Sequence, residues 1–295
     1  MIAFASNSLL CRAALRDTEI DAASFTFIRI FSGAVALWLI VRSRSIVAAV
    51  YDRRNNSSGA HRAPLQGTWA SAFALFAYAA AFSFAYVDLS AGTGALLLFG
   101  AVQATMIVWG FHKGERLDVL QIIGFAVAMF GLIVLVSPGL TAPPLIGSML
   151  MLAAGLAWGV YSVRGKVRGA SRTGGGLASD ATAATTGNFL RAVPFAAAVS
   201  VITIRQMRLD SSGVTYAIIS GAITSGLGYV IWYRVLPRIK ASSAAVVQLS
   251  APVIAATGGI LLLDEPITLR YAIASIAVLG GILLVIIERR STTFV

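Results

Sequence analysis

Two arginines lie inside long apolar stretches, and their side chains are the ones most able to do chemistry here. Arg29 follows Phe27-Ile28, and Arg191 follows Phe189-Leu190, so the two contexts match. A cation inside hydrocarbon is costly, so such a residue normally faces a cavity or a polar partner. The functional interpretation is contact with an anionic group of a solute. The structural alternative is a hydrogen bond to carbonyls at a helix end, or a side chain that reaches the lipid interface.

Aromatic side chains recur at helical spacing and would offer flat binding surfaces. The sets at i, i+3 or i, i+4, which share one helix face, are Trp158 with Tyr161, Tyr229 with Trp232 and Tyr233, and Tyr78 with Phe82. Around a cavity, such rings stack on flat solutes or hold cations over their faces. The alternative is an aromatic belt at the lipid headgroups, which we expect for Tyr86, Trp232 and Tyr233. We expect the deeper Tyr78, Trp158 and Tyr229 to line a cavity.

Amide side chains within the apolar stretches need hydrogen-bond partners; they are Asn7, Gln103, Asn188 and Gln248. Bonds between helices would satisfy them, each contributing about 1 kcal/mol or less. Gln248 precedes Pro252 by one helical turn, and proline removes a backbone donor and kinks a helix. We therefore expect Pro252 to act as a gate beside Gln248.

These features together predict one solute site. The expected substrate-binding residues are Asn7, Arg29, Tyr78, Gln103, Trp158, Tyr161, Arg191, Tyr229 and Gln248, with Pro252 as the gating residue. No Asp or Glu falls at the centre of an apolar stretch, where a proton-coupled antiporter often keeps its carboxylate. Proton antiport, exchange and facilitated diffusion therefore stay open. We expect Glu115 and Glu265 to cap the helices that follow them, since negative charge favours a helix N-terminus.

No catalytic or metal-binding set is expected. His61 and His112 lie in a loop and at a helix end, and Cys11 has no partner cysteine. Gly174-Gly175-Gly176 lacks the Gly-Lys-Ser/Thr of a phosphate-binding loop and reads as a linker. We therefore expect neither enzyme activity nor a cofactor, and no ATP-driven step.

The elements that position these residues are apolar stretches of roughly 20 residues, the length at which a helix crosses a bilayer. The chain is 58% hydrophobic and only 12% charged, with a mean hydropathy of +0.83. The expected spans are Ile2–Leu15, Ala22–Val41, Gly67–Val87, Ala91–Phe111, Val119–Val136, Ile146–Val163, Ala181–Ile204, Val214–Leu236, Ala241–Leu263 and Ile267–Ile287. The first is short, reaching about 22 Å. The sequence predicts an all-α polytopic integral membrane protein whose partner is the lipid bilayer.

The net charge of +11 is distributed as a topology signal, and we expect no nucleic-acid partner. Most of the 23 Lys and Arg residues fall in the segments that share one side of the membrane with both termini. Positively charged segments stay in the cytoplasm. We therefore expect both termini to be cytoplasmic, in the inner membrane of a bacterium. The sequence leaves a homodimer open.

Two halves of the sequence match weakly. Residues 91–137 align without gaps on residues 241–287, and in both a glutamate separates a helix rich in small residues from the next helix. Two five-span halves, residues 1–140 and 141–295, must then insert in opposite orientations. Inverted repeats of this kind underlie many secondary transporters, with a site near mid-membrane between the halves.

The chain resembles the EamA type of the drug/metabolite transporter superfamily over essentially its whole length. The resemblance rests on Ser6-Asn7, Phe27-Ile28-Arg29, Ala157-Trp158-Gly159-Val160-Tyr161, Gly226–Tyr233, Gln248–Ile254 and Leu263-Asp264-Glu265-Pro266. It implies ten helices in two inverted five-helix repeats, and export of small organic solutes such as amino acids or drug-like metabolites. Two positions depart from the family pattern, because Phe4 replaces a usual tryptophan and Val102 replaces the proline that Pro252 keeps.

The expected function is therefore secondary export of a small organic solute by alternating access. Exchange of nucleotide sugars or phosphorylated solutes is the alternative within the superfamily, and it would need several cations facing the cavity. A membrane scaffold or signalling protein without transport is the alternative of another class, and it would require neither inverted halves nor buried arginines.

Overall fold

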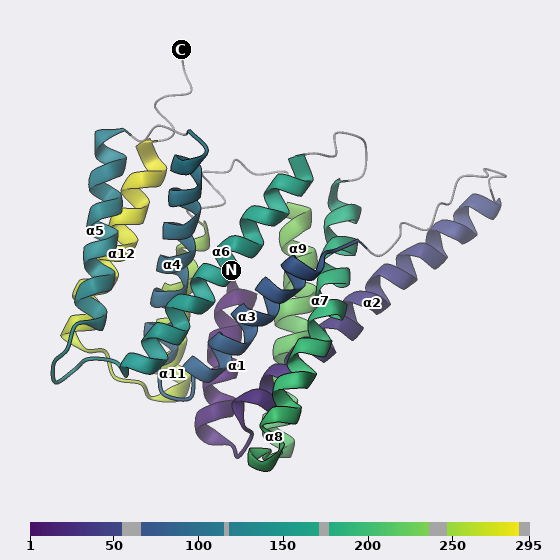
Figure 1. The fold of residues 1–295 in the computed structure, drawn as a ribbon, viewed down its shortest axis with the longest axis horizontal. Helices are drawn as coiled ribbons and strands as arrows, with labels where there is room; N and C mark the ends of the chain where they lie inside the picture. Colours follow the sequence, from purple (N-terminus) through teal and green to yellow (C-terminus); the bar gives the residue numbers. More distant parts are fainter. Residues whose placement is uncertain (55–65, 115–117, 171–176, 236–246, 289–295) are drawn as a thin grey trace.

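The computed structural model describes residues 1–295 except 55–65, 115–117, 171–176, 236–246 and 289–295. Its elements are α1 (Ile2–Asp17), α2 (Ala22–Arg54), α3 (Trp69–Ala85), α4 (Ala91–His112), α5 (Val119–Val136), α6 (Leu145–Ala170), α7 (Leu177–Ile202), the 3-10 turn η1 (Ile204–Gln206), the continuous run α8 (Ser211–Ile218), η2 (Ile219–Leu227) and α9 (Gly228–Val235), then α11 (Ser250–Leu263) and α12 (Leu269–Glu288). Counting α8–η2–α9 as one helix, the described residues form ten long helices, which confirms the predicted all-α fold (Figure 1).

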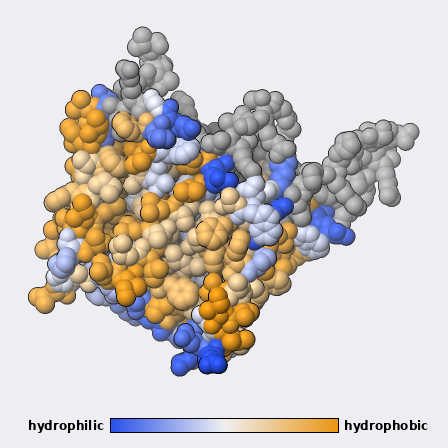
Figure 2. Space-filling view, in the orientation of Figure 1, coloured by the Kyte–Doolittle hydropathy of each residue, from blue (hydrophilic) through white to orange (hydrophobic). Residues whose placement is uncertain are grey.

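The helices carry an apolar surface suited to lipid. Six of them are long and apolar enough to cross a membrane, and α3 and α11 are shorter apolar helices. Large hydrophobic side chains stand exposed, such as Phe130 at 64% and Ile276 at 75%, and hydrophobic residues dominate the face in Figure 2. In water such a surface would drive aggregation, whereas lipid tails solvate it.

Helices of each half pack against helices of the other half, and the contacts of the first half are mirrored in the second. In the first half α1 packs on η2 and α11, and in the second half the equivalent α6 packs on α3 and α4. Likewise α2 packs on η2, α7 packs on α3, and α5 packs on α12. The described connections α1–α2, α3–α4, α5–α6, α7–α8 and α11–α12 lie at the lower end of Figure 1, so α1 and α6 run in opposite directions. The halves are therefore inverted, while the boundary between residues 140 and 141 stays a prediction.

Glycines allow the closest helix contacts. At the α5–α12 contact, a Cβ on Gly281 would collide with the carbonyl oxygen of Gly124, and a Cβ on Gly124 would lie 2.6 Å from that of Gly281. At the α4–α6 contact, a Cβ on Gly155 would lie 2.5 Å from Cβ of Ala101. Small residues of this kind are what membrane helices use to bring their backbones together.

Five short connections define one end of the bundle, here called the short-loop face: residues 18–21, 86–90, 137–144, 203–210 and 264–268. There, Oε1 of Glu265 lies 3.1 Å from Nε of Arg12, and Oε2 of Glu265 accepts the N–H of Ala91 at 2.8 Å. The Arg12 and Glu265 side chains are only 14% and 8% exposed. We call Arg12, Glu265 and Ala91 the latch, because they join α1, α4 and the α11–α12 connection.

The prediction that Glu265 caps the helix that follows it is therefore wrong, since it caps the start of α4 instead. The reason is that Asp264 adopts a left-handed conformation (φ 49°) and α12 begins only at Leu269. Thr268 takes the capping role at α12 by accepting the N–H of Tyr271 at 3.1 Å. The matching prediction for Glu115 falls on a residue outside the described ranges.

Asp21 makes a second connection across the short-loop face. Its carboxylate accepts the N–H groups of Ala23 at 3.0 Å and Ser24 at 2.9 Å, and it also accepts the N–H of Arg208 at 2.9 Å. Burial on its own would raise the pKa of Asp21, but these hydrogen bonds stabilise the anion and the pKa is lowered. The α1–α2 and α7–α8 connections are thus joined through one carboxylate.

Gly281→Val will destabilise the protein, whereas Gly280→Val will not. The added side chain at position 281 meets the α5 backbone, and overpacking of this kind typically costs about 1–3 kcal/mol. At Gly280, an added Cβ meets nothing within 4 Å, so the adjacent residue serves as a matched control. The measurement is the midpoint of thermal unfolding in detergent. Equal midpoints for the two variants would contradict the close α5–α12 contact.

Glu265→Gln will lower the unfolding midpoint, because it leaves Arg12 without its anion in a largely buried position. A hydrogen bond to a charged group contributes about 1.5–3 kcal/mol. Glu19→Gln removes the same charge from the Arg208 pair, whose side chains are 72% and 76% exposed, and exposed pairs contribute about 1 kcal/mol or less. A midpoint for Glu265→Gln that equals that of Glu19→Gln would show that the latch is not a stabilising contact.

Candidate functional site

Four helices bring five of the ten predicted site residues together near the middle of the bundle. Tyr78 comes from α3, Trp158 and Tyr161 from α6, Tyr229 from α9, and Arg29 from α2; we call these five the central cluster. The ring centroid of Trp158 lies 4.8 Å from that of Tyr78, 5.3 Å from that of Tyr229 and 5.4 Å from that of Tyr161. The cluster thus joins helices of both halves around one half-buried tryptophan.

Arg29 lies inside this cluster with only 3% of its surface exposed. Its Nη2 donates to the hydroxyl of Tyr78 at 3.0 Å, and its guanidinium carbon lies 4.7 Å from the ring centroid of Phe82. Nη1 is buried and has no hydrogen-bond partner among the described residues. Among the described residues, Arg29 thus makes no bond to helix-end carbonyls and does not reach the interface, and its binding role stays a prediction.

Arg191 does not join Arg29, although their sequence contexts match. Its Nη1 donates at 2.9 Å to the carbonyl oxygen of Gly187, one turn earlier in α7. Gly187 lies in the interior of α7, so this bond is to the same helix and not to a helix end, and the binding role of Arg191 stays a prediction. Its neighbour Asn188 accepts the N–H of Thr68 at 3.0 Å and donates to the Tyr161 hydroxyl at 3.3 Å, which ties the start of α3 to the cluster.

Asn7 lies in a separate polar network. Its Nδ2 donates to Oγ of Ser225 at 3.2 Å, and its Oδ1 accepts from Ser220 at 2.7 Å and from Thr224 at 2.5 Å. All three partners belong to η2, a stretch of π-helix, and π-helical turns are frequent at functional sites. Asn7 thus holds α1 against η2, directly before the helix that carries Tyr229.

Gln103, Gln248 and Pro252 have no described hydrogen bond or ring contact to the central cluster. Gln103 is buried on α4, and Gln248 is half-buried. The helix is interrupted at Leu249, and Pro252 lies in the first turn of α11, where its ring would clash with the Gln248 carbonyl of a continuous helix. The gating role of Pro252 stays a prediction.

Three phenylalanines that were not predicted as site residues border the cluster. Phe82 lies beneath the Arg29 guanidinium, and Phe4 and Phe189 lie edge-on to Tyr229 at 5.7 and 5.9 Å. The i, i+4 spacing of Tyr78 and Phe82 is a signal for the first, whereas the other two contacts depend on how helices pack.

The expectation of a headgroup role for Tyr86 is wrong, because Tyr86 is fully buried and its hydroxyl donates to the Ala91 carbonyl at 3.2 Å.

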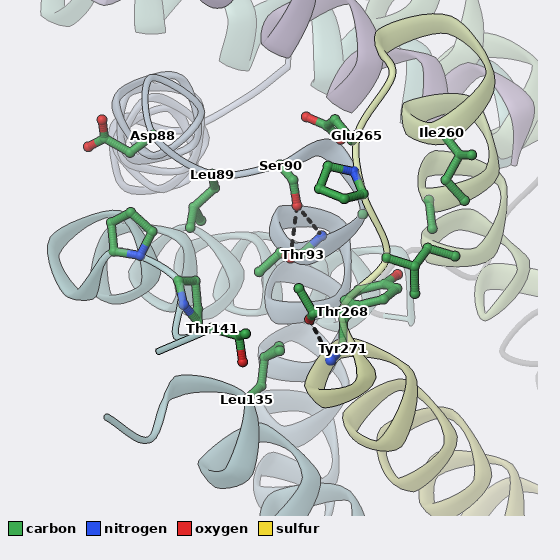
Figure 3. Close-up of a pocket in the computed structure, with 16 residues that line it drawn as sticks. Asp88, Leu89, Ser90, Thr93, Leu135, Thr141, Ile260, Glu265, Thr268 and Tyr271 are labelled. Atoms are coloured by element: carbon green, nitrogen blue, oxygen red, sulfur yellow. Dashed lines mark hydrogen bonds between the residues drawn. The ribbon is translucent and has the colours of Figure 1, made fainter. Parts of the chain in front are cut away.

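A cavity of about 220 Å³ opens at the short-loop face, away from the central cluster (Figure 3). Its wall is made of the α3–α4, α5–α6 and α11–α12 connections and the helix ends beside them. Its lining includes the acidic residues Asp88 and Glu265 and the hydroxyl-bearing residues Ser90, Thr93 and Thr268. None of the predicted site residues lines this cavity, while Glu265 of the latch does.

The sequence profile of the EamA-like transporter family matches residues 145–287. An uncharacterized protein of Pseudomonas aeruginosa is 51% identical over 98% of this chain and 92% of its own length. A protein of Escherichia coli named a probable amino-acid metabolite efflux pump is 25% identical over 66% of this chain and 67% of its own length. A protein of Streptantibioticus cattleyicolor named a probable terminal-alkyne amino-acid exporter is 29% identical over 70% of this chain and 68% of its own length.

The fold also has a solved counterpart. A crystal structure superposes with a TM-score of 0.62 over 98% of this chain and 95% of that one, at 18% sequence identity. The structural similarity shows a shared fold, whereas the family profile and the relatives show similarity in sequence. With its ten helices and inverted halves, this chain is a membrane transporter that belongs to the EamA-like transporter family.

Proposed function

We propose that this protein exports small organic solutes, such as amino acids, metabolites or drug-like compounds, by alternating access without ATP. The observation that carries the proposal is the central cluster, in which α2 and α3 of one half meet α6 and α9 of the other. A site shared by two inverted halves changes its accessible side when one half rocks against the other. The names of the Escherichia coli and Streptantibioticus relatives support an exported solute related to amino acids.

Each end of the pathway has its own part in this mechanism. With both termini cytoplasmic, the short-loop face is the outer face of a bacterial inner membrane. There the latch ties α1 of the first half to the α11–α12 connection of the second. Outward opening must separate these parts, so the latch acts as an outer gate. Gln248 and Pro252, beside the interruption at Leu249, lie nearer the cytoplasmic end of α11 and are the proposed hinge there.

Exchange of nucleotide sugars or phosphorylated solutes is less well supported. Two or more phosphate charges need several cations, and Arg29 is the only Lys or Arg in the central cluster. A non-transporting scaffold or signalling protein would have no use for a shared aromatic site with a buried cation. A homodimer stays a prediction.

Trp158→Ala will reduce solute efflux from loaded proteoliposomes at least tenfold, because Trp158 contacts three other rings of the proposed site. The control is Trp69→Ala, which removes a tryptophan that is 59% exposed at the start of α3. Both variants should run as single peaks in gel filtration. Efflux by Trp158→Ala at the rate of Trp69→Ala would remove the central cluster from the transport pathway.

Collapse of a pH gradient will leave the initial rate of efflux unchanged. The described side chains of Asp and Glu all lie at helix ends or in connections, so none is placed to carry protons through the centre of the bundle. The measurement compares initial rates in proteoliposomes with and without a protonophore. A loss of most of the rate would establish proton coupling and overturn this mechanism.

A further inference from the structure

We propose that Arg29 and Tyr78 form a clamp for a single carboxylate, so that the transported solutes are small monocarboxylates with an aromatic or apolar group. This inference rests on the proposed function, and it adds the chemical class of the solute and the residues that select it. Three features of the cluster carry it: an unsatisfied donor, the arrangement of two donors, and the charge of the surroundings.

The first feature is the unsatisfied donor. Nη1 of Arg29 is buried without a described partner, in a side chain that is 3% exposed. A buried donor without an acceptor loses its hydration and gains nothing in return. A chain keeps such a group in hydrocarbon when a ligand supplies the acceptor.

The second feature is the position of a second donor beside the first. The Tyr78 oxygen accepts from Nη2 of Arg29 at 3.0 Å, which leaves the hydroxyl hydrogen of Tyr78 free to be donated. The Nη1–H of Arg29 and the O–H of Tyr78 are thus two donors on adjoining groups. A carboxylate presents two acceptor oxygens in one plane, so one oxygen can accept from Nη1 of Arg29 in a charge-assisted bond and the other from the Tyr78 hydroxyl.

The third feature is the charge around the clamp. The ion pairs formed by described residues are Arg12–Glu265, Arg16–Asp17 and Arg208–Glu19, and all three lie at the short-loop face. No described carboxylate therefore neutralises Arg29, and one carboxylate of a solute would do so completely. A phosphate dianion would bring an excess negative charge into a site that holds a single cation, which is costly in hydrocarbon.

The rest of the cluster determines what the carboxylate is attached to. Phe82 and Tyr78 cover the guanidinium, while Trp158 packs against Tyr78 and carries the rings of Tyr161 and Tyr229 on its other contacts. Ring faces attract flat apolar groups and also the ammonium group of an amino acid. Trp158 is half-buried and contacts Tyr78 at 4.8 Å, so it is the side chain that must move to admit the carboxylate.

The test compares matched probes on the purified full-length protein in proteoliposomes. The probes are 3-phenylpropionate, its uncharged isostere 3-phenylpropionamide, phenethylamine and phenyl phosphate, each as a competitor of efflux and in thermal-shift titrations. The carboxylate should act at concentrations about 10- to 100-fold lower than the amide, as expected for hydrogen bonds to a charged group. Phenyl phosphate should be no better than the amide.

Variants identify the groups responsible. Arg29→Gln should bring the ratio of carboxylate to amide affinity close to one, and Tyr78→Phe should reduce it about tenfold while keeping the ring contacts. Arg42→Gln is the control, because Arg42 is an exposed arginine of the same helix whose guanidinium lies over Trp38. Since the ratio is measured within each variant, partial loss of folded protein does not change it, and Tyr78→Phe serves if Arg29→Gln does not fold.

The outcomes separate this inference from the proposed function. Equal competition by carboxylate and amide, or tighter binding of phenyl phosphate, would overturn the carboxylate clamp while leaving transport through the cluster intact. An unchanged ratio in both Arg29→Gln and Tyr78→Phe would do the same. Failure of every probe to bind or compete would overturn the clamp, and unchanged efflux by Trp158→Ala would then overturn the proposed site as well.

Discussion

A single buried cation, Arg29, which none of the described carboxylates neutralises, governs the centre of this transporter. The Arg29 guanidinium is held by the Tyr78 hydroxyl and by the faces of Phe82 and Tyr78. Such contacts are weaker than an ion pair, because rings and hydroxyls carry only partial charges. A bound anionic solute would compensate the remaining positive charge of Arg29. The uncompensated charge therefore destabilises the empty site and favours the loaded one. The rings and helices around the cation leave only 3% of the Arg29 surface exposed.

The arrangement of the helices meets two requirements, because the two halves must stay together and must also move relative to one another. Close backbone contacts at Gly124 and Gly281 make the α5–α12 pair a rigid seam at one edge of the bundle. The latch, by contrast, consists of one ion pair and a few hydrogen bonds at a protein end. A rocking motion would preserve the seam and break the latch. The structure therefore places its strong and its breakable contacts in different parts of the molecule.

Much of the fold could be predicted from the sequence, because the thickness of the bilayer dictates the length of each span. Ring clusters were also predictable where residues share a helix face, as Trp158 and Tyr161 do. What could not be predicted depends on contacts between helices. Arg29 and Arg191 have similar neighbours in sequence, yet one lies among rings of another helix and the other bonds to its own helix. Glu265 caps α4, which is distant in sequence, and Tyr86 lies in the interior rather than among headgroups.

The π-helical stretch η2 has a consequence for the rotational phase of the helix that follows it. Its nine residues follow the wider i→i+5 winding, in which each residue advances the chain by less than the roughly 100° of an α-helical residue. Rewinding η2 as α-helix would rotate every later side chain of α9 about the helix axis and carry Tyr229 away from Trp158. Asn7 is hydrogen-bonded to three hydroxyls of this stretch, and these bonds favour the winding that brings all three to one amide. The Asn7 side chain on α1 thus influences the direction in which the Tyr229 ring of α9 points.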